Sequence, residues 1–207
     1  MRLVIFKVIA VAIFISLFLN ACQKSEYARK LEAGLSSGER YDSLFLNLHF
    51  GTEVKDFFDI CWQMNKEGLV IQGPSNLSVE YKLDSGALKH QAIMRFYPEF
   101  HNSKIYQMPI NFLYKGWAPW TKHLAVDSLE LDVKNLMERW YGPGFVLAEN
   151  DDKSQKLWVK VDGNRRIRIF KKSIKEVRVD ITDMTILDEA LEAKAKKKKE
   201  RDQKNNS

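Results

Sequence analysis

Few side chains in this sequence have types and spacings that could carry covalent or acid–base chemistry. The two cysteines, Cys22 and Cys61, are far apart in the chain. No two of the four histidines have metal-ligand spacing; they are His49, His90, His101 and His123. The sequence contains no Gly-x-Ser-x-Gly elbow, no glycine-rich phosphate loop and no His-Glu-x-x-His motif. It therefore predicts a protein that is not an enzyme and that holds no cofactor and no metal.

The first 22 residues have the features of an export signal. Arg2 and Lys7 are followed by an apolar run over residues 8–19. This run matches the apolar core of a signal peptide, about 7–15 residues, and is shorter than the roughly 20 residues that span a bilayer. The next residues, Leu19-Asn20-Ala21-Cys22, resemble the lipobox of bacterial lipoproteins. The alternative is an uncleaved N-terminal anchor that contains a cysteine by chance.

The lipobox resemblance implies how and where the protein is attached. Cys22 would take a diacylglycerol on its sulfur, the signal peptide 1–21 would be removed, and the new amine would be acylated, commonly with palmitate. In the resembled lipoproteins an aspartate after the cysteine often retains the protein at the inner membrane, and this chain has Gln23. We therefore expect an exported protein anchored by lipid to the cell envelope, at the outer membrane. Residues 23–26 partly resemble a surface-export signal, so both the periplasmic and the outer face stay open.

The charge distribution argues against a nucleic-acid partner. The formal net charge is +6, and removal of Arg2 and Lys7 with the signal leaves +4. Residues 194–204 contain seven basic and two acidic residues, a surplus of +5, so the remaining body carries about −1. A nucleic-acid domain concentrates its basic residues on a folded face. Residues 187–207 are instead predicted as a basic tail that begins as a frayed helix and is disordered from Lys196 onwards.

Hydrophobic periodicity divides the mature chain into a tether, residues 22–40, and two halves, residues 41–124 and 125–186. In the first half the apolar residues follow helical spacing and are Val54, Phe57, Phe58, Cys61 and Trp62. Strand signals follow near residues 69–71, 77–83, 92–97 and 106–113, the last with Pro109, which suggests a sheet edge or a bulge. Cys61 lies within the apolar stripe, so we interpret it as a buried, inert thiol and not as a nucleophile.

The second half repeats this order. A helix beginning near Ser128 is predicted from the spacing of its apolar residues, which are Leu129, Val133, Leu136, Met137 and Trp140. Four strand signals follow near residues 145–147, 157–161, 166–170 and 177–181. Residues 54–59 and 133–138 agree in residue class at every position. The sequence thus predicts an α+β fold of tandem helix-plus-antiparallel-meander repeats; the alternative is a chance likeness of two amphipathic helices.

An aromatic loop between the halves is the candidate binding element. The segment Tyr114-Lys115-Gly116-Trp117-Ala118-Pro119-Trp120 places two tryptophans in a loop broken by glycine and proline. Tyrosine and tryptophan dominate binding hot spots, so Tyr114, Trp117 and Trp120 are candidates for holding a partner protein or a sugar. The alternative is that both indoles fold over the seam between the halves.

The segment Phe50-Gly51-Thr52-Glu53-Val54 resembles the helix start of small envelope lipoproteins of the SmpA/OmlA assembly-factor group. The tandem helix-then-strands plan also resembles that of β-lactamase-inhibitor-type proteins. Both resemblances imply binding to another protein without catalysis. We therefore expect a non-catalytic envelope lipoprotein that serves as a protein–protein interaction or assembly module. The alternative function is a glycan-binding or glycan-processing accessory that uses Trp117 and Trp120.

Overall fold

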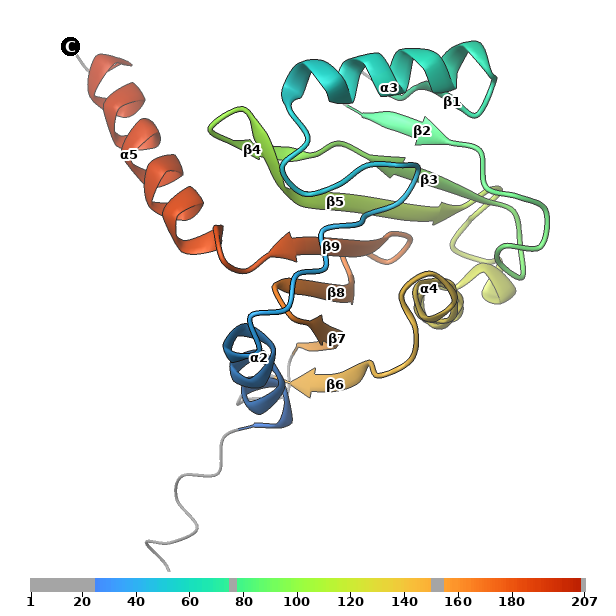
Figure 1. The fold of residues 1–207 in the computed structure, drawn as a ribbon. Helices are drawn as coiled ribbons and strands as arrows, with labels where there is room; N and C mark the ends of the chain where they lie inside the picture. The colour runs from blue at the N-terminus through green and yellow to red at the C-terminus, as the bar shows by residue number, and fades with distance from the viewer. Residues whose placement is uncertain (1–24, 75–77, 150–154, 206–207) are drawn as a thin grey trace, which may run out of the picture.

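The structure is a computed structural model that describes residues 25–74, 78–149 and 155–205 (Figure 1). The described part is an α+β fold with four α-helices and one open, antiparallel sheet of nine strands, which confirms the predicted fold class. The helices are α2 (Glu26–Ser36), α3 (Val54–Lys66), α4 (Val126–Tyr141) and α5 (Leu187–Asn205), with a short 3-10 helix η2 (Lys122–Leu124) before α4.

The sheet has the order β1-β2-β3-β5-β9-β8-β7-β6, and β4 pairs with β5. Its strands are β1 (Val70–Gln72), β2 (Val79–Tyr81), β3 (Ala92–Phe96), β4 (Glu99–His101), β5 (Lys104–Tyr114), β6 (Val146–Glu149), β7 (Lys156–Asp162), β8 (Arg165–Lys171) and β9 (Val177–Asp183). The last strands of the two halves, β5 and β9, therefore pair at the centre of the sheet. In Figure 1, α3 lies at the β1 end and α2 at the β6 end.

The core lies between one face of the sheet and helices α3 and α4. Antiparallel register places Ile110 opposite Val179 and Ile181 opposite Ile167, so these apolar side chains share one face. α4 packs on β5, β8 and β9 through its buried residues, of which the apolar ones are Leu129, Val133, Leu136 and Met137. The helix begins at Val126, two residues before Ser128, where the sequence predicted its start. It ends at Tyr141, because the next residue, Gly142, has a φ of 81° and breaks the helix.

Pro109 does not mark a sheet edge, because β5 has a neighbour on both sides. The Pro109 carbonyl accepts from the Tyr97 backbone N–H at 3.4 Å, so the Pro109 nitrogen also points to the side of β3 and β4. Those two strands are interrupted there, at residues 97 and 98. The proline's missing N–H therefore falls at a gap in the ladder and leaves the pairing with β9 intact.

The opposite face of the sheet is polar near its centre. Asp180 accepts from Arg168 at 2.9 Å on one neighbouring strand and from Arg178 at 2.6 Å on its own strand. Toward the β6 end, α2 packs on β6 and β7 and covers this face. Each of these charged side chains therefore has a partner within the protein.

The basic C-terminal segment forms helix α5, and its first turns contact the body. Ala190 is buried, Glu189 lies 3.0 Å from His101, and Lys194 donates to Glu99 at 2.5 Å. Nearly every described side chain after Ala190 is exposed. The sequence suggested a frayed or disordered tail, whereas the structure has a helix attached by its first two turns.

Removal of residues 194–207 is expected to change the melting temperature by less than about 4 °C, because the described side chains of this segment are exposed and the Lys194–Glu99 ion pair is worth at most about 1 kcal/mol. Removal of residues 187–207 should cost more, since Ala190 and the Glu189–His101 contact go as well. Differential scanning calorimetry of both truncations checks this. A large loss from the shorter truncation would show that the distal turns of α5 are packed.

Candidate protein-binding surface

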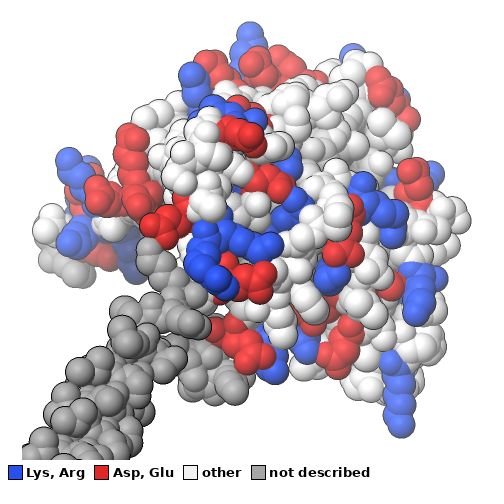
Figure 2. Space-filling view, turned by 60° about the horizontal axis from the view of Figure 1, so that its bottom comes forward, with Lys and Arg blue, Asp and Glu red and all other residues white. Residues whose placement is uncertain are grey.

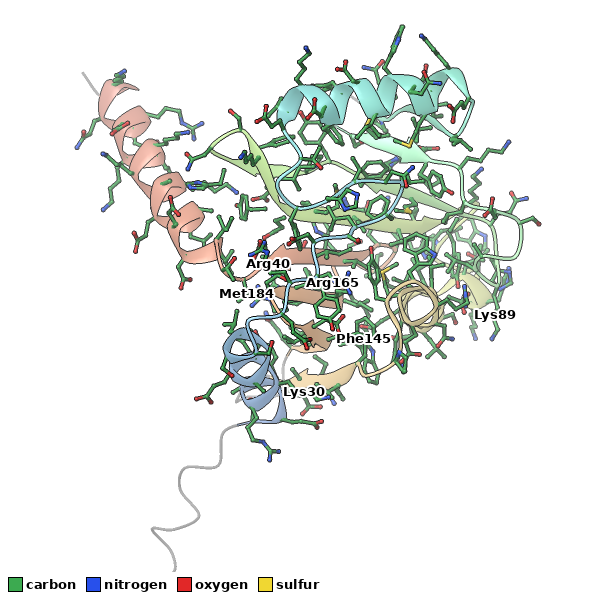
Figure 3. The ribbon with its side chains drawn as sticks, viewed as in Figure 1. Lys30, Arg40, Lys89, Phe145, Arg165 and Met184 are labelled. Carbon is green, nitrogen blue, oxygen red and sulfur yellow. The ribbon has the colours of Figure 1, made fainter. Side chains whose placement is uncertain are left out.

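A groove of about 680 Å³ lies at the β1 end of the sheet. It is formed by β1, the ends of β2 and β3, and residues 82–91, which connect β2 to β3. This connection is held in place from both sides: the Lys89 backbone N–H donates to Asp132 of α4 at 2.9 Å, and the Gln91 carbonyl accepts from the Lys115 backbone N–H at 2.8 Å. Figure 3 shows Lys89 on this connection, close to α4. The groove therefore has a fixed wall.

The lining of the groove is partly apolar and partly charged, with more basic than acidic side chains. Leu69, Ile71 and Ile93 contribute apolar surface. The basic side chains of the lining come from Lys82, Lys89, His90 and Lys115, and the acidic ones from Glu80 and Asp84. Glu80 is already bound to Arg95 at 3.0 Å. The groove therefore suits a ligand that combines apolar and acidic groups.

Helix α3 presents two exposed aromatic side chains at the same end of the molecule. Phe57 is fully buried, whereas Phe58 is 50% and Trp62 is 64% exposed. At about 100° per residue, Phe58 and Trp62 lie about 100° and 140° around the helix axis from Phe57, too far to reach the same core. The sequence placed all three in one buried stripe, and this prediction is wrong for Phe58 and Trp62. Trp62 instead lies under the ammonium group of Lys66, 5.3 Å from the ring centre.

The edge strand β1 contacts helix α3. Leu69 and Ile71 are 40% and 56% exposed, and β1 is the last strand of the sheet at this end. Asn65 of α3 donates from its side chain to the Val70 carbonyl at 2.9 Å, which blocks part of the edge. We call the groove, β1 and the exposed residues Phe58 and Trp62 the β1-edge surface.

The structure does not bring the three predicted binding residues together on a surface. Tyr114 is 1% exposed, and its hydroxyl donates to the buried Asp132 at 2.7 Å. Burial and this hydrogen bond raise the pKa of Tyr114. Tyr114 is therefore a core residue that joins β5 to α4, and it is not accessible to a partner.

Trp117 and Trp120 differ from each other. Trp117 is half-buried against the core, with Lys175 5.8 Å from its ring centre, as the seam interpretation predicts. Trp120 is 80% exposed. The loop thus offers a single free indole and not a paired platform.

Comparisons with known proteins do not assign the chain. No family model, curated protein or solved structure matches it. The candidate surface therefore depends on the geometry alone.

The β1-edge surface was only partly accessible to sequence reasoning. The helix stripe was recognised, but its division into a buried and an exposed side depends on where the sheet lies. The folding of residues 82–91 against α4 depends on the distant Asp132.

Cys61 is half-buried in α3, and burial raises the pKa of its thiol to about 11. A thiol with this pKa is protonated at neutral pH, which agrees with the interpretation of an inert side chain.

Alkylation of Cys61 by iodoacetamide at pH 8 is expected to be roughly tenfold to a hundredfold slower than that of a model thiol, because the thiolate is scarce although each thiolate is more nucleophilic. The rate should rise up to about pH 11. Mass spectrometry of the folded protein over time measures this, with the urea-unfolded protein as control. Equal rates in the two states would contradict a shielded thiol.

The described residues include no group of three or more His, Cys, Asp or Glu side chains that could hold a metal ion. The nearest histidine pair, His90 and His123, has ring centres 5.4 Å apart at the end of the sheet where the groove lies. His101 contacts Glu189 and Asn102.

Cys22 lies outside the described residues, so its lipidation stays a prediction. Within the described ranges, no helix is long and apolar enough to cross a membrane.

Proposed function

We propose that this protein is a lipid-anchored, non-catalytic interaction module of the bacterial cell envelope that holds a partner protein on its β1-edge surface. The observation that supports it most is the exposure of Phe58 and Trp62 on α3, the helix that contacts β1, together with a groove that β1 lines and that has a fixed wall. The resemblance of residues 19–22 to a lipobox supports the anchor.

The exposed aromatic side chains favour a protein partner. Burial of apolar surface contributes about 25 cal/mol per Å², and an aromatic side chain offers 150–250 Å² or so, which makes tryptophan a frequent binding hot spot. Trp62 is rigid at its base because α3 is packed through Phe57 and Met64. A partner that covers Phe58 and Trp62 therefore loses little conformational entropy from this side of the interface.

The groove adds a requirement for the partner's chemistry. Its lining combines three lysines with apolar side chains, so a segment with apolar side chains and carboxylates fits best. The groove would fix the position of the partner segment and select for its negative charge. Phe58 and Trp62 would contribute most of the binding free energy.

The tandem-repeat architecture is part of the same proposal. Each of α3 and α4 precedes an antiparallel meander, and the final strands β5 and β9 pair at the centre. Phe57 and Leu136, the aligned core residues, are both buried. The next aligned pair does not match, because Met137 is buried and Phe58 is exposed. Lys134 and Lys55, which are also aligned, differ as well: Lys55 is exposed, whereas Lys134 packs over Trp158 at 5.1 Å and binds Glu138.

The double variant Phe58→Ala/Trp62→Ala is expected to keep its melting temperature within about 4 °C, because both side chains are exposed. Its yield of a defined cross-linked partner should fall at least about tenfold, because hot-spot residues each contribute about 2 kcal/mol or more. A photo-reactive amino acid at Gln63, exposed on the same helix, captures the partner from envelopes. Lys55→Ala, exposed on α3, is the matched control. Equal capture by both variants would refute the proposed surface.

A glycan-binding role is the second candidate, supported by the free indole of Trp120. Stacking of a sugar on this ring would change its fluorescence. Titration of the protein and of Trp120→Ala with peptidoglycan fragments and envelope polysaccharide tests it: saturable quenching that the variant lacks favours the glycan, and no response excludes it.

A further inference from the structure

The described part of the predicted tether, residues 25–40, is attached to the body along most of its length. The α2 helix begins after Ser25, whose hydroxyl accepts from the Ala28 N–H at 3.1 Å. The helix packs on β6 and β7, and the Tyr27 hydroxyl accepts from Arg166 of β8 at 3.0 Å. At Gly34 the helix comes so close that an added Cβ would lie 2.8 Å from Val161 and 2.9 Å from the Gly163 carbonyl.

The chain between α2 and the core is also fixed. Arg40 donates to Asp183 at 2.9 Å, and Asp183 is only 1% exposed. The Tyr41 backbone N–H donates to Asn164 at 2.6 Å. Arg165 donates to the Ser43 carbonyl at 2.9 Å and stacks against the rings of Tyr41 and Tyr141. Figure 3 shows Arg40 and Arg165 beside each other at this junction.

These contacts leave a very short free connection to a lipidated Cys22. Ser25 is already part of the attached structure, so only three peptide links separate it from Cys22. Three residues span at most about 11 Å, whatever their conformation. The start of α2 must then lie at the level of the lipid headgroups.

We propose that the docked tether fixes the orientation of the domain on the membrane, with the α2/β6 side against the bilayer and the β1-edge surface directed away from it. The proposal depends on the proposed lipidation of Cys22. Figure 1 shows α2 at the end of the sheet opposite the one that carries α3. The sheet order puts seven strand spacings between β6 and β1, or about 34 Å at about 4.8 Å each.

Charge does not set this orientation. The face that comes forward in Figure 2, on the side of α2, carries basic and acidic side chains intermixed. On α2 itself, Lys30 lies 3.8 Å from Glu26. The membrane is therefore the partner of this side because of the anchor's reach and not because of a basic patch.

Energy transfer to an acceptor dye in the bilayer tests the orientation. The lipidated protein, with Cys61→Ser, is reconstituted in vesicles of phosphatidylethanolamine and phosphatidylglycerol. A donor is placed either at Ala33→Cys on α2 or at Lys55→Cys on α3, both exposed. Transfer should be strong from position 33 and at least fivefold weaker from position 55. Similar transfer from both positions would overturn the proposal.

Two variants test whether the orientation depends on the attachment of the tether to the body and not on the lipid anchor alone. A 20-residue Gly-Ser insert after Lys24 adds a reach of about 25 Å and should abolish the contrast between the two donor positions. Gly34→Val forces α2 away from Val161 and should also reduce the difference in energy transfer between positions 33 and 55. Hydrogen exchange of residues 37–43 shows whether this segment is released while the strands of the sheet stay protected. An unchanged contrast with the insert would overturn the proposal.

Mass spectrometry before reconstitution distinguishes a failure of the proposed lipidation from a failure of the proposed orientation. An unmodified Cys22 refutes the proposed function's anchor, and with it this orientation. A lipidated Cys22 with equal transfer from positions 33 and 55 refutes the orientation alone.

Discussion

Replacement of Cys22 by alanine is expected to move the protein entirely from the membrane fraction to the soluble fraction or to leave it as an uncleaved precursor. A diacylglyceryl group supplies two acyl chains, and each buried CH₂ contributes about 0.8 kcal/mol to membrane binding. With the lipid nearly all of the protein is therefore bound to the membrane, and without it nearly none is held there by lipid. Fractionation of envelopes, followed by intact-mass measurement of the protein, gives the result.

The control for this change is Cys61→Ala. Cys61 belongs to α3 and has a shielded thiol, so its replacement should leave the protein in the membrane fraction. If the native protein carries an unmodified Cys22 and retains Met1, the proposed attachment to the membrane by lipid is refuted.

Phe57→Ala is expected to lower the free energy of unfolding by about 3–5 kcal/mol. Phe57 is fully buried and contacts the rings of Phe100 and Tyr97, with ring centres 6.0 and 5.7 Å away. Truncation to alanine removes the transfer free energy of the ring and leaves a cavity that the sheet cannot fill. Urea denaturation followed by circular dichroism measures the change.

The neighbouring Phe58→Ala has the same chemistry and serves as the matched control. Because Phe58 is half exposed, its truncation should cost less than about 1 kcal/mol. Leu136→Ala, at the aligned position in α4, should cost about 2–5 kcal/mol. Equal losses from Phe57→Ala and Phe58→Ala would show that α3 packs in another rotation.

Local sequence patterns were sufficient to predict most of the elements. The two amphipathic helices and the β-rich segments after each of them occur where periodicity indicates, because these signals depend only on neighbouring residues. The short strand β4 was missed because three residues, Glu99–His101, are too few to show alternation. Of the two predictions for Pro109, the sheet edge is wrong, whereas a register irregularity does occur close by, where β4 pairs with β5.

The candidate site was less predictable because exposure is a tertiary property. Phe58 and Tyr114 are both aromatic residues, yet Phe58 is half exposed and Tyr114 is buried against Asp132. Asp132 is 18 residues from Tyr114 and 43 from Lys89, and only the folded chain shows that one carboxylate holds both. Sequence spacing alone contains no signal for such a junction.

The pairing of β5 with β9 also determines when the chain can fold. Met108 and Ile181 are opposite each other in the sheet, although 73 residues separate them in the sequence. A chain delivered from its N-terminus has β5 ready long before β9 arrives, and until then the apolar face and one ladder edge of β5 are unpaired. Such non-local pairing slows folding and exposes aggregation-prone surface. Nascent chains that end before residue 177 should therefore be bound by holdase chaperones, and those that extend past residue 183 should be released.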